Sequence, residues 1–245
     1  MPTTFALLHG AWHDAWCWHL VVDELTRRGH RALAVDFPTE DPAAGASACA
    51  DLVVEALRGE GSGAAGDVVV VAHSMGGLVA PIVAERWLVR RVVFVAGLLP
   101  LVGASFDDQQ ALEAREGRGR IIVPGLGRGQ VDHGDGSTSW GDLDRAIAKM
   151  CPDAPAGLAR EAAGHLRRQH FTVMREVSPL REWPKIDYAS IVCADDGVVS
   201  AAWGRQAFRD RFSVSGRTAQ AIELPGDHSP FLSRPGDLVE LIERA

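Results

Sequence analysis

A serine stands between a predicted buried strand and a predicted helix in the N-terminal half of the chain. The run Val68-Val69-Val70-Val71 is wholly apolar and β-branched, which is typical of a strand buried on both faces. It continues into Ala72-His73-Ser74-Met75-Gly76-Gly77 and then into a helical pattern from Leu78 to Arg86. Small residues two positions either side of Ser74 permit a tight strand-to-helix turn that exposes its hydroxyl. The pattern predicts a nucleophilic serine; a serine that only caps the helix is the alternative.

A serine nucleophile needs a general base, and the base needs an acid that orients it. In one recurrent arrangement on parallel sheets, the acid and then a histidine follow the serine in the chain. His228 occupies a glycine- and proline-bounded loop after the predicted strand Ala219–Leu224. We therefore expect His228 to be the base, although a surface histidine is the simpler interpretation of any one of the nine histidines.

Two adjacent carboxylates follow the predicted strand Ser190–Ala194 and are candidates for the acid. Asp196, one step further beyond the strand and next to Gly197, is the preferred acid, and Asp195 is the alternative. Such a pair could also form a turn or cap the next helix. Asp227 is too close to His228 in the chain to orient it, and is expected to be a turn residue.

The negative charge that develops on a carbonyl oxygen during attack needs preorganised hydrogen-bond donors. The backbone N–H of Met75, where the predicted helix begins, is one candidate. The second candidate is the N–H of Ala11, in the loop His9-Gly10-Ala11-Trp12 after the predicted strand Thr4–Leu8. Trp12 is the best candidate for a residue that contacts substrate.

Strands and helices alternate over most of the chain, which predicts an α/β protein with a mostly parallel, doubly wound sheet. All the candidate residues then fall at the carboxyl ends of strands, where such sheets carry their active sites. The remaining predicted strands and helices are strands Arg31–Val35 and Arg91–Val95 and helices Asp14–Arg28, Ser47–Leu57, Ala201–Phe212 and Pro235–Arg244.

A long segment interrupts this alternation, so we predict a core in two parts, residues 1–100 and 184–245, with an insertion at 101–183. The insertion contains a glycine-rich, strand-poor part from Gly117 to Gly141 and helical patterns over Leu143–Lys149 and Ala156–Arg168. Long excursions in compact domains are commonly functional, so we expect a helical cap over the site; a solvated surface excursion is the alternative. Apolar faces are predicted on both helices, formed by Leu143, Ile147 and Met150 and by Leu158, Ala162 and Leu166.

The sequence resembles the α/β-hydrolase superfamily, and most closely the branch of plant methylesterases and hydroxynitrile lyases with their small bacterial relatives. The matching segments are Leu8-His9-Gly10-Ala11-Trp12-His13, Ala15-Trp16-Cys17-Trp18, the serine turn, Phe94 to Pro100 and Gly226-Asp227-His228. The resemblance implies an α/β-hydrolase fold with Ser74, His228 and Asp196 as the triad and Ala11 and Met75 as oxyanion donors. Residues from about Leu101 to Ser178 match poorly.

Two departures from that branch disfavour the lyase activity. The lyases carry threonine directly after the first-loop histidine and lysine directly after the catalytic histidine, whereas this chain has Gly10 and Ser229. Neither residue supplies the hydroxyl or the positive charge that assists a departing cyanide.

The composition fits a globular chain of 245 residues, with 47% hydrophobic and 23% charged residues. A net charge of −7 argues against nucleic acid or an anionic membrane as a partner. No apolar run approaches a membrane span and no signal peptide is evident, so we expect a cytoplasmic protein. The four cysteines have no metal-binding spacing and are expected to be buried free thiols.

The sequence thus predicts a serine hydrolase that cleaves a small apolar carboxylic ester or lactone through an acyl-enzyme, without metal or organic cofactor. A small-molecule substrate is the expected partner, and a homodimer is compatible with the sequence. The alternatives are a lyase, a C–C hydrolase or an isomerase of natural-product metabolism, or a ligand-binding protein without turnover.

Overall fold

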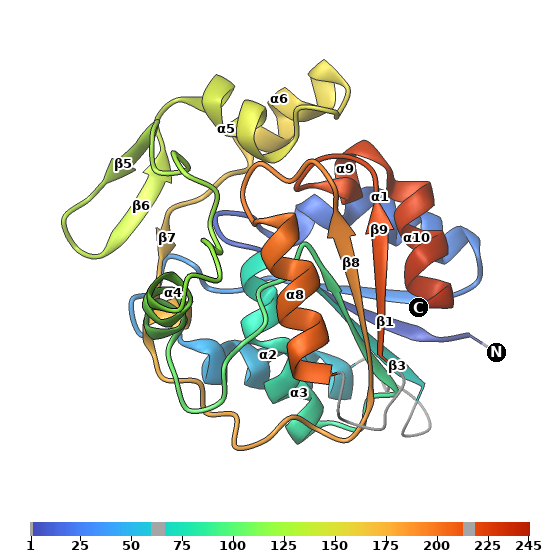
Figure 1. The fold of residues 1–245 in the computed structure, drawn as a ribbon. Coiled ribbons are helices and arrows are strands. Elements are labelled where there is room, and N and C mark those ends of the chain that lie inside the picture. The colour runs from blue at the N-terminus through green and yellow to red at the C-terminus, as the bar shows by residue number, and fades with distance from the viewer. Residues whose placement is uncertain (1, 60–66, 213–218) are drawn as a thin grey trace.

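A computed structural model describes residues 2–59, 67–212 and 219–245 of the chain. Six parallel strands form one sheet in the order β2-β1-β3-β4-β8-β9 (Figure 1), which confirms the predicted doubly wound α/β fold. The strands are β1 (Thr4–Leu8), β2 (Arg31–Val35), β3 (Val68–His73), β4 (Arg91–Val95), β8 (Asp187–Cys193) and β9 (Ala219–Leu224).

Alternating side chains of the central strands pack on opposite faces of this sheet. In β3, Val70 and Ala72 join one apolar cluster, whereas Val69 and Val71 join the other. The first cluster includes side chains of α2 (Ala46–Gly59), α3 (Ala80–Arg86) and α8 (Ala201–Phe212). The second includes side chains of α1 (His19–Arg27), α9 (Pro230–Ser233) and α10 (Pro235–Arg244). Because β3 is buried on both faces, its valine run needs no polar alternation.

Residues 101–183 form separate elements, some of which lie above the arrowheads of β8 and β9 in Figure 1 and others to the left of the sheet. A small antiparallel sheet has the order β5-β6-β7. The elements of this insertion are α4 (Phe106–Arg115), β5 (Gln130–Asp132), β6 (Ser137–Trp140), α5 (Leu143–Met150), α6 (Ala156–Gly164), β7 (Gln169–His170) and α7 (Thr172–Arg175).

Several predictions for the insertion were wrong. The glycine-rich part contains the hairpin of β5 and β6, in which Gly134 and Gly136 adopt φ of 74° and 85° and allow a tight reversal. The helix predicted to reach Arg168 ends at Gly164, and the chain then straightens into β7. Helix α4 was missed because its sequence is largely polar; its signal is the capping box of Ser105 and Asp108.

In the core, two predicted helices begin as separate 3₁₀ turns. The helix predicted over Asp14–Arg28 starts with a 3₁₀ segment, Ala15–Trp18, whose first turn is capped by the Asp14 carboxylate. The helix predicted after Ser74 starts as a 3₁₀ segment, Ser74–Leu78, before α3. The four cysteines are buried and unpaired, as predicted. Among the described residues, no helix has both the length and the apolar character needed to cross a bilayer.

Candidate active site

Ser74 follows β3 directly in a strained backbone conformation. Its φ is 48°, in the left-handed region that non-glycine residues seldom adopt. A side chain at Gly76 would place its Cβ 2.8 Å from the His9 carbonyl oxygen, and one at Gly77 would overlap the Leu98 carbonyl. The two glycines therefore let the turn press against the ends of β1 and β4, as the sequence predicted for position 76. The Ser74 carbonyl also accepts the Leu98 N–H at 2.9 Å.

His228 and Asp196 lie together at the same edge of the sheet. The distance from His228 Nδ1 to Asp196 Oδ2 is 2.8 Å, and the two side chains are 3% and 2% exposed. An ionised carboxylate only accepts hydrogen bonds, so the imidazole proton is assigned to Nδ1 and Nε2 keeps a lone pair. That tautomer is the one a general base requires.

The Asp196 carboxylate is held by its own turn. Its Oδ1 accepts the backbone N–H groups of Val198 and Val199 at 2.7 and 2.8 Å. The neighbouring Asp195 is exposed and accepts the Gly226 N–H at 3.3 Å, so it braces the histidine loop instead of the imidazole. In the structure, therefore, Asp196, the preferred acid, is hydrogen-bonded to His228, whereas Asp195, the alternative, is not.

Two further histidines, His73 and His13, lie close to His228. His73 Nε2 donates to the His228 carbonyl at 2.9 Å, and its ring centroid lies 4.5 Å from that of His228. Burial, with a smaller contribution from the neighbouring His228, holds the pKa of His73 well below its usual value. Burial likewise lowers the pKa of His13 to about 3, with smaller contributions from His9 and His228.

The loop after β1 presents the predicted oxyanion donor. Phe37 N–H donates to His9 Nε2 at 2.9 Å, so His9 Nδ1 carries the proton and donates to the Gly10 carbonyl at 2.8 Å. In a trans peptide, the Ala11 N–H points opposite to that carbonyl. No hydrogen bond of the Ala11 N–H occurs among the residues that the structure describes. Met75 lies in the first turn of its 3₁₀ segment, where backbone N–H groups lack partners within the helix.

Trp12, the predicted substrate contact, is 6% exposed and is largely covered by the insertion. Its ring centroid lies 5.6 Å from those of Trp140 and Phe171, both edge to face. Its indole N–H donates to Thr138 Oγ1 at 3.0 Å. The side chain therefore joins the loop after β1 to the insertion.

Asp227 is a residue whose importance the sequence interpretation underestimated. Its Oδ1 accepts the Ser229 N–H and the Ser233 hydroxyl, both at 3.0 Å. Its Oδ2 accepts the N–H of Asp153, in the insertion, at 2.9 Å. Burial raises the pKa of this carboxyl. Asp227 is thus a turn residue, as predicted, and it also ties the histidine loop to the insertion.

The predicted apolar faces of α5 and α6 meet above the core. A small recess between them is lined by His13, Ile147, Met150, Cys151, Ala162, Ala163, Leu166 and Leu232. Leu143, predicted on the same inward face, is instead 44% exposed because it stands at the first position of α5. The first fully buried residue of α5 is Ala146, and Ile147 and Met150 line the recess.

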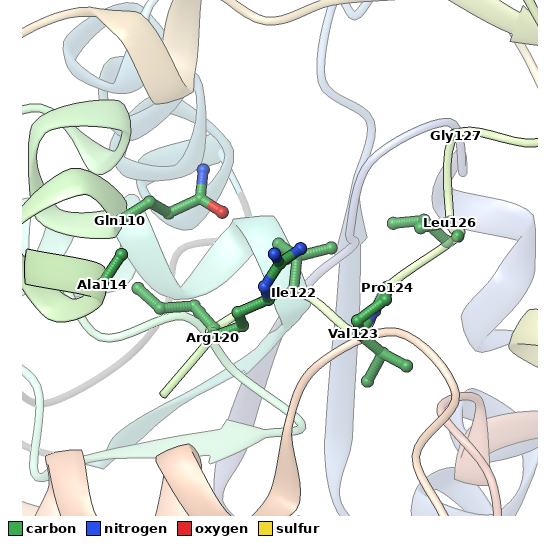
Figure 2. Close-up of a pocket in the computed structure, with 10 residues that line it drawn as sticks. Gln110, Ala114, Arg120, Ile122, Val123, Pro124, Leu126 and Gly127 are labelled. Carbon is green, nitrogen blue, oxygen red and sulfur yellow. The ribbon is translucent and has the colours of Figure 1, made fainter. Parts of the chain in front are cut away.

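A larger cavity of about 370 Å³ opens between α4 and the segment Arg120–Gly127 (Figure 2). Its lining is mainly apolar, with Arg120 and Gln110 as polar members, and it includes none of the triad candidates. Its wall is nevertheless hydrogen-bonded to the turn that follows Asp196, because the Val123 N–H donates to the Val198 carbonyl at 2.8 Å.

A parallel α/β sheet with a strained serine after a central strand, and a histidine–carboxylate pair at the same edge, is the arrangement of α/β hydrolases. Residues 5–241 match the alpha/beta hydrolase family. The chain therefore belongs to that family.

Named relatives agree with this assignment. Methyl jasmonate esterase 1 of Vitis vinifera is 26% identical over 98% of this chain and 95% of its own length. Probable esterase PIR7A of Oryza sativa subsp. indica is 39% identical, but over only 40% of each chain.

Solved structures show the same fold. A pyrethroid hydrolase from Sphingobium faniae JZ-2 aligns with a TM-score of 0.75 at 22% identity, over 100% of this chain and 97% of that one. Polyneuridine aldehyde esterase aligns with a TM-score of 0.79 at 18% identity, over 100% of this chain and 99% of that one.

Proposed function

We propose that the protein hydrolyses a small apolar carboxylic ester or lactone through an acyl-enzyme on Ser74. The observation that carries this proposal is the 2.8 Å bond between His228 and the buried Asp196 carboxylate, at the edge of the sheet where the strained Ser74 stands. The names of the relatives, a methyl jasmonate esterase and a pyrethroid hydrolase among them, support ester hydrolysis.

In this mechanism, His228 Nε2 takes the Ser74 proton as the hydroxyl oxygen attacks the ester carbonyl carbon. The Ala11 and Met75 N–H groups stabilise the oxyanion, and Asp196 stabilises the imidazolium. His228 then protonates the departing alcohol. Water, activated by the same histidine, releases the acid and restores Ser74.

The surroundings of the histidine support this role. His73 and His13 stay neutral at physiological pH because burial lowers the pKa of each. Neither of these two rings therefore adds a positive charge beside the imidazolium that forms on His228.

The space around Gly10 disfavours the lyase alternative, because the threonine that the lyases carry there would not fit. A Cβ at this position would lie 2.7 Å from His73 Nδ1 and 2.9 Å from Ser74 Cβ. A threonine could be accommodated only if these groups moved. Ser229 also offers no positive charge beside the histidine.

We further propose that residues 101–183 act as a cap that selects the substrate. The apolar lining of the cavity at Arg120–Gly127 and of the recess under α5 and α6 supports an apolar acyl or alcohol group.

A panel of aryl and alkyl esters of graded chain length tests the proposed activity. We expect hydrolysis of apolar esters and no release of cyanide from mandelonitrile above the uncatalysed background. Release of cyanide that disappears in Ser74→Ala would instead identify a lyase. Absence of turnover on every ester, with no labelling by a fluorophosphonate, would favour a binding protein.

A further inference from the structure

The oxyanion loop is strained immediately after its proposed donor. Trp12 has φ of 63°, which is a rare conformation for a bulky side chain. Such strain costs on the order of 1–3 kcal/mol and persists only where surrounding contacts enforce it. The contacts that enforce it here determine how the Ala11 N–H is aimed.

These contacts come from a strap, residues 167–170, which lies between α6 and α7 of the insertion. The Arg167 N–H donates to the Trp12 carbonyl at 2.7 Å, and the Trp12 N–H donates to Gln169 Oε1 at 3.1 Å. The Arg167 guanidinium also donates to the His13 carbonyl at 3.0 Å. Both peptide groups flanking the Trp12 Cα are therefore bonded to the strap.

Gln169 is itself fixed in orientation. Its side chain is 1% exposed, and its Nε2 donates to the His170 carbonyl. This bond turns Oε1 towards the Trp12 N–H. Gln169 also pairs with Thr138 in the small sheet, and the His170 N–H donates to the Thr39 carbonyl in the core at 2.8 Å.

The hydrogen bond from Trp12 to Gln169 has a consequence for the neighbouring amide. Two successive N–H groups, those of Ala11 and Trp12, lie in this loop. Gln169 engages the second and fixes the plane of the Ala11–Trp12 peptide, while His9 fixes the Gly10–Ala11 peptide through its carbonyl. The Ala11 N–H is then held from both sides and has no hydrogen-bond partner among the described residues, as an oxyanion donor requires.

We propose that Gln169 is a positioning residue for the oxyanion hole, so that the insertion contributes to catalysis as well as to substrate choice. This proposal rests on the proposed ester hydrolysis. An oxyanion donor acts more strongly on the transition state than on the bound ester, so its misplacement lowers kcat with little change in KM.

The test compares three substitutions on one hydrolysed ester. Gln169→Met keeps the length and removes the acceptor, and should lower kcat by roughly tenfold or more, less than the effect of deleting a whole donor. Gln169→Glu, ionised or protonated, still offers an oxygen to the Trp12 N–H and should retain more of the kcat than Met. Thr138→Val is the matched control: it removes the partner of the Trp12 indole but no backbone contact, and should leave kcat near that of the wild type.

Thermal unfolding of each variant separates positioning from folding. A purely structural role predicts a lower Tm with unchanged kcat, and makes Glu the more damaging substitution because it can bury a charge. If Gln169→Met fails to fold, Gln169→Asn, one methylene too short to reach both partners, should lower kcat in the same direction.

Two failures are distinguishable. A wild type that hydrolyses no ester and takes no fluorophosphonate on Ser74 contradicts the proposed function, and the positioning role falls with it. A wild type that does both, with equal kcat for a folded Gln169→Met or Gln169→Asn, contradicts the positioning role alone. Equal losses in Gln169→Met and Thr138→Val would also contradict it.

Discussion

The carboxyl edge of the sheet and the insertion differ in the types of residue that adopt positive φ at their turns. At the sheet edge, the described non-glycine residues with positive φ are Trp12, Ser74 and Ala96, which follow β1, β3 and β4. In residues 101–183, every described residue with positive φ is a glycine. Strain is thus confined to the edge, where buried neighbours enforce it, and the insertion reverses direction through residues that tolerate the conformation.

This difference teaches where each kind of substitution should act. Groups held at the strained edge have one geometry, so changes there should abolish chemistry. Side chains of the insertion that pack against one another can repack, so changes there should alter substrate preference by smaller factors. The strap at Gln169 is the exception, because it contacts the strained loop directly.

The largest effect is expected for Ser74→Ala, which removes the proposed nucleophile at the edge. Loss of a triad member leaves only the contribution of binding and the oxyanion hole, so kcat should fall by roughly 10⁴-fold or more. Steady-state kinetics on an accepted ester measure this fall, with Tm as the control for folding. A kcat near that of the wild type on every accepted ester would contradict the proposed mechanism.

The second prediction separates two adjacent carboxylates at the same edge. Asp196→Asn should lower kcat by about 10³–10⁴-fold, because the amide no longer stabilises the required tautomer of His228. Asp195→Asn is the matched control and should change kcat by only a few-fold, since Asp195 bonds to the Gly226 N–H and not to the imidazole. The reverse order of effects would move the acid to Asp195.

The third prediction concerns pH and the neutral histidines beneath the edge. The pKa of His13 is lowered to about 3 in the fold, against about 6.5 in an unfolded chain. Between these values the unfolded chain binds the extra proton, so the free energy of unfolding falls as pH falls below about 6.5. The slope is about 1.4 kcal/mol per pH unit for each such histidine.

Urea unfolding of the wild type and of His13→Gln from pH 7.5 to pH 5 measures this slope. The substitution should flatten the dependence, and His73, whose pKa is also lowered, should account for part of what remains. The charged and titratable groups that influence His13 are His9, His228 and Arg167, so all three must be present in both proteins. Identical slopes in the two proteins would show that His13 is not buried in neutral form.

The smallest effects are expected in the recess between α5 and α6. Met150→Ala and Leu166→Ala should change the ratio of kcat/KM between long and short esters by about two- to tenfold, because each alters an apolar contact worth a few methylenes. Leu143→Ala is the control on the same helix α5, since its side chain is 44% exposed and lies outside the recess. Equal changes on all esters, or none, would mean that the insertion is a surface excursion.

The two regions also differ in how far the sequence predicts them. The strands at the edge were predicted to within a few residues, because buried parallel strands have apolar runs bounded by turn residues. The preference for Asp196 over Asp195 relied on its distance from the strand end, its place beside Gly197 and the family resemblance, and it agrees with the hydrogen bond to His228. The residues at this edge can be predicted because each follows a short apolar run that is recognisable in the sequence by itself.

The insertion was predicted less well because its helices and strands depend on contacts between segments that are far apart in the sequence. Helix α4 has few apolar residues in a helical period, and the two-residue strand β7 is too short to carry any period. The link from Trp12 to Gln169 spans 157 residues, so no local pattern indicates it. The link from Asp227 to Asp153 is likewise invisible in the sequence, because a backbone N–H provides the donor.

Covalent capture of Ser74 tests the central claim most directly. The purified protein is incubated with a fluorophosphonate, and the modified peptide is identified by mass spectrometry while residual ester hydrolysis is followed. We predict one phosphonyl group per chain, on Ser74, with activity lost in proportion to modification. Hydrolysis that survives complete modification of Ser74, or an active enzyme modified only at another residue, would contradict the account.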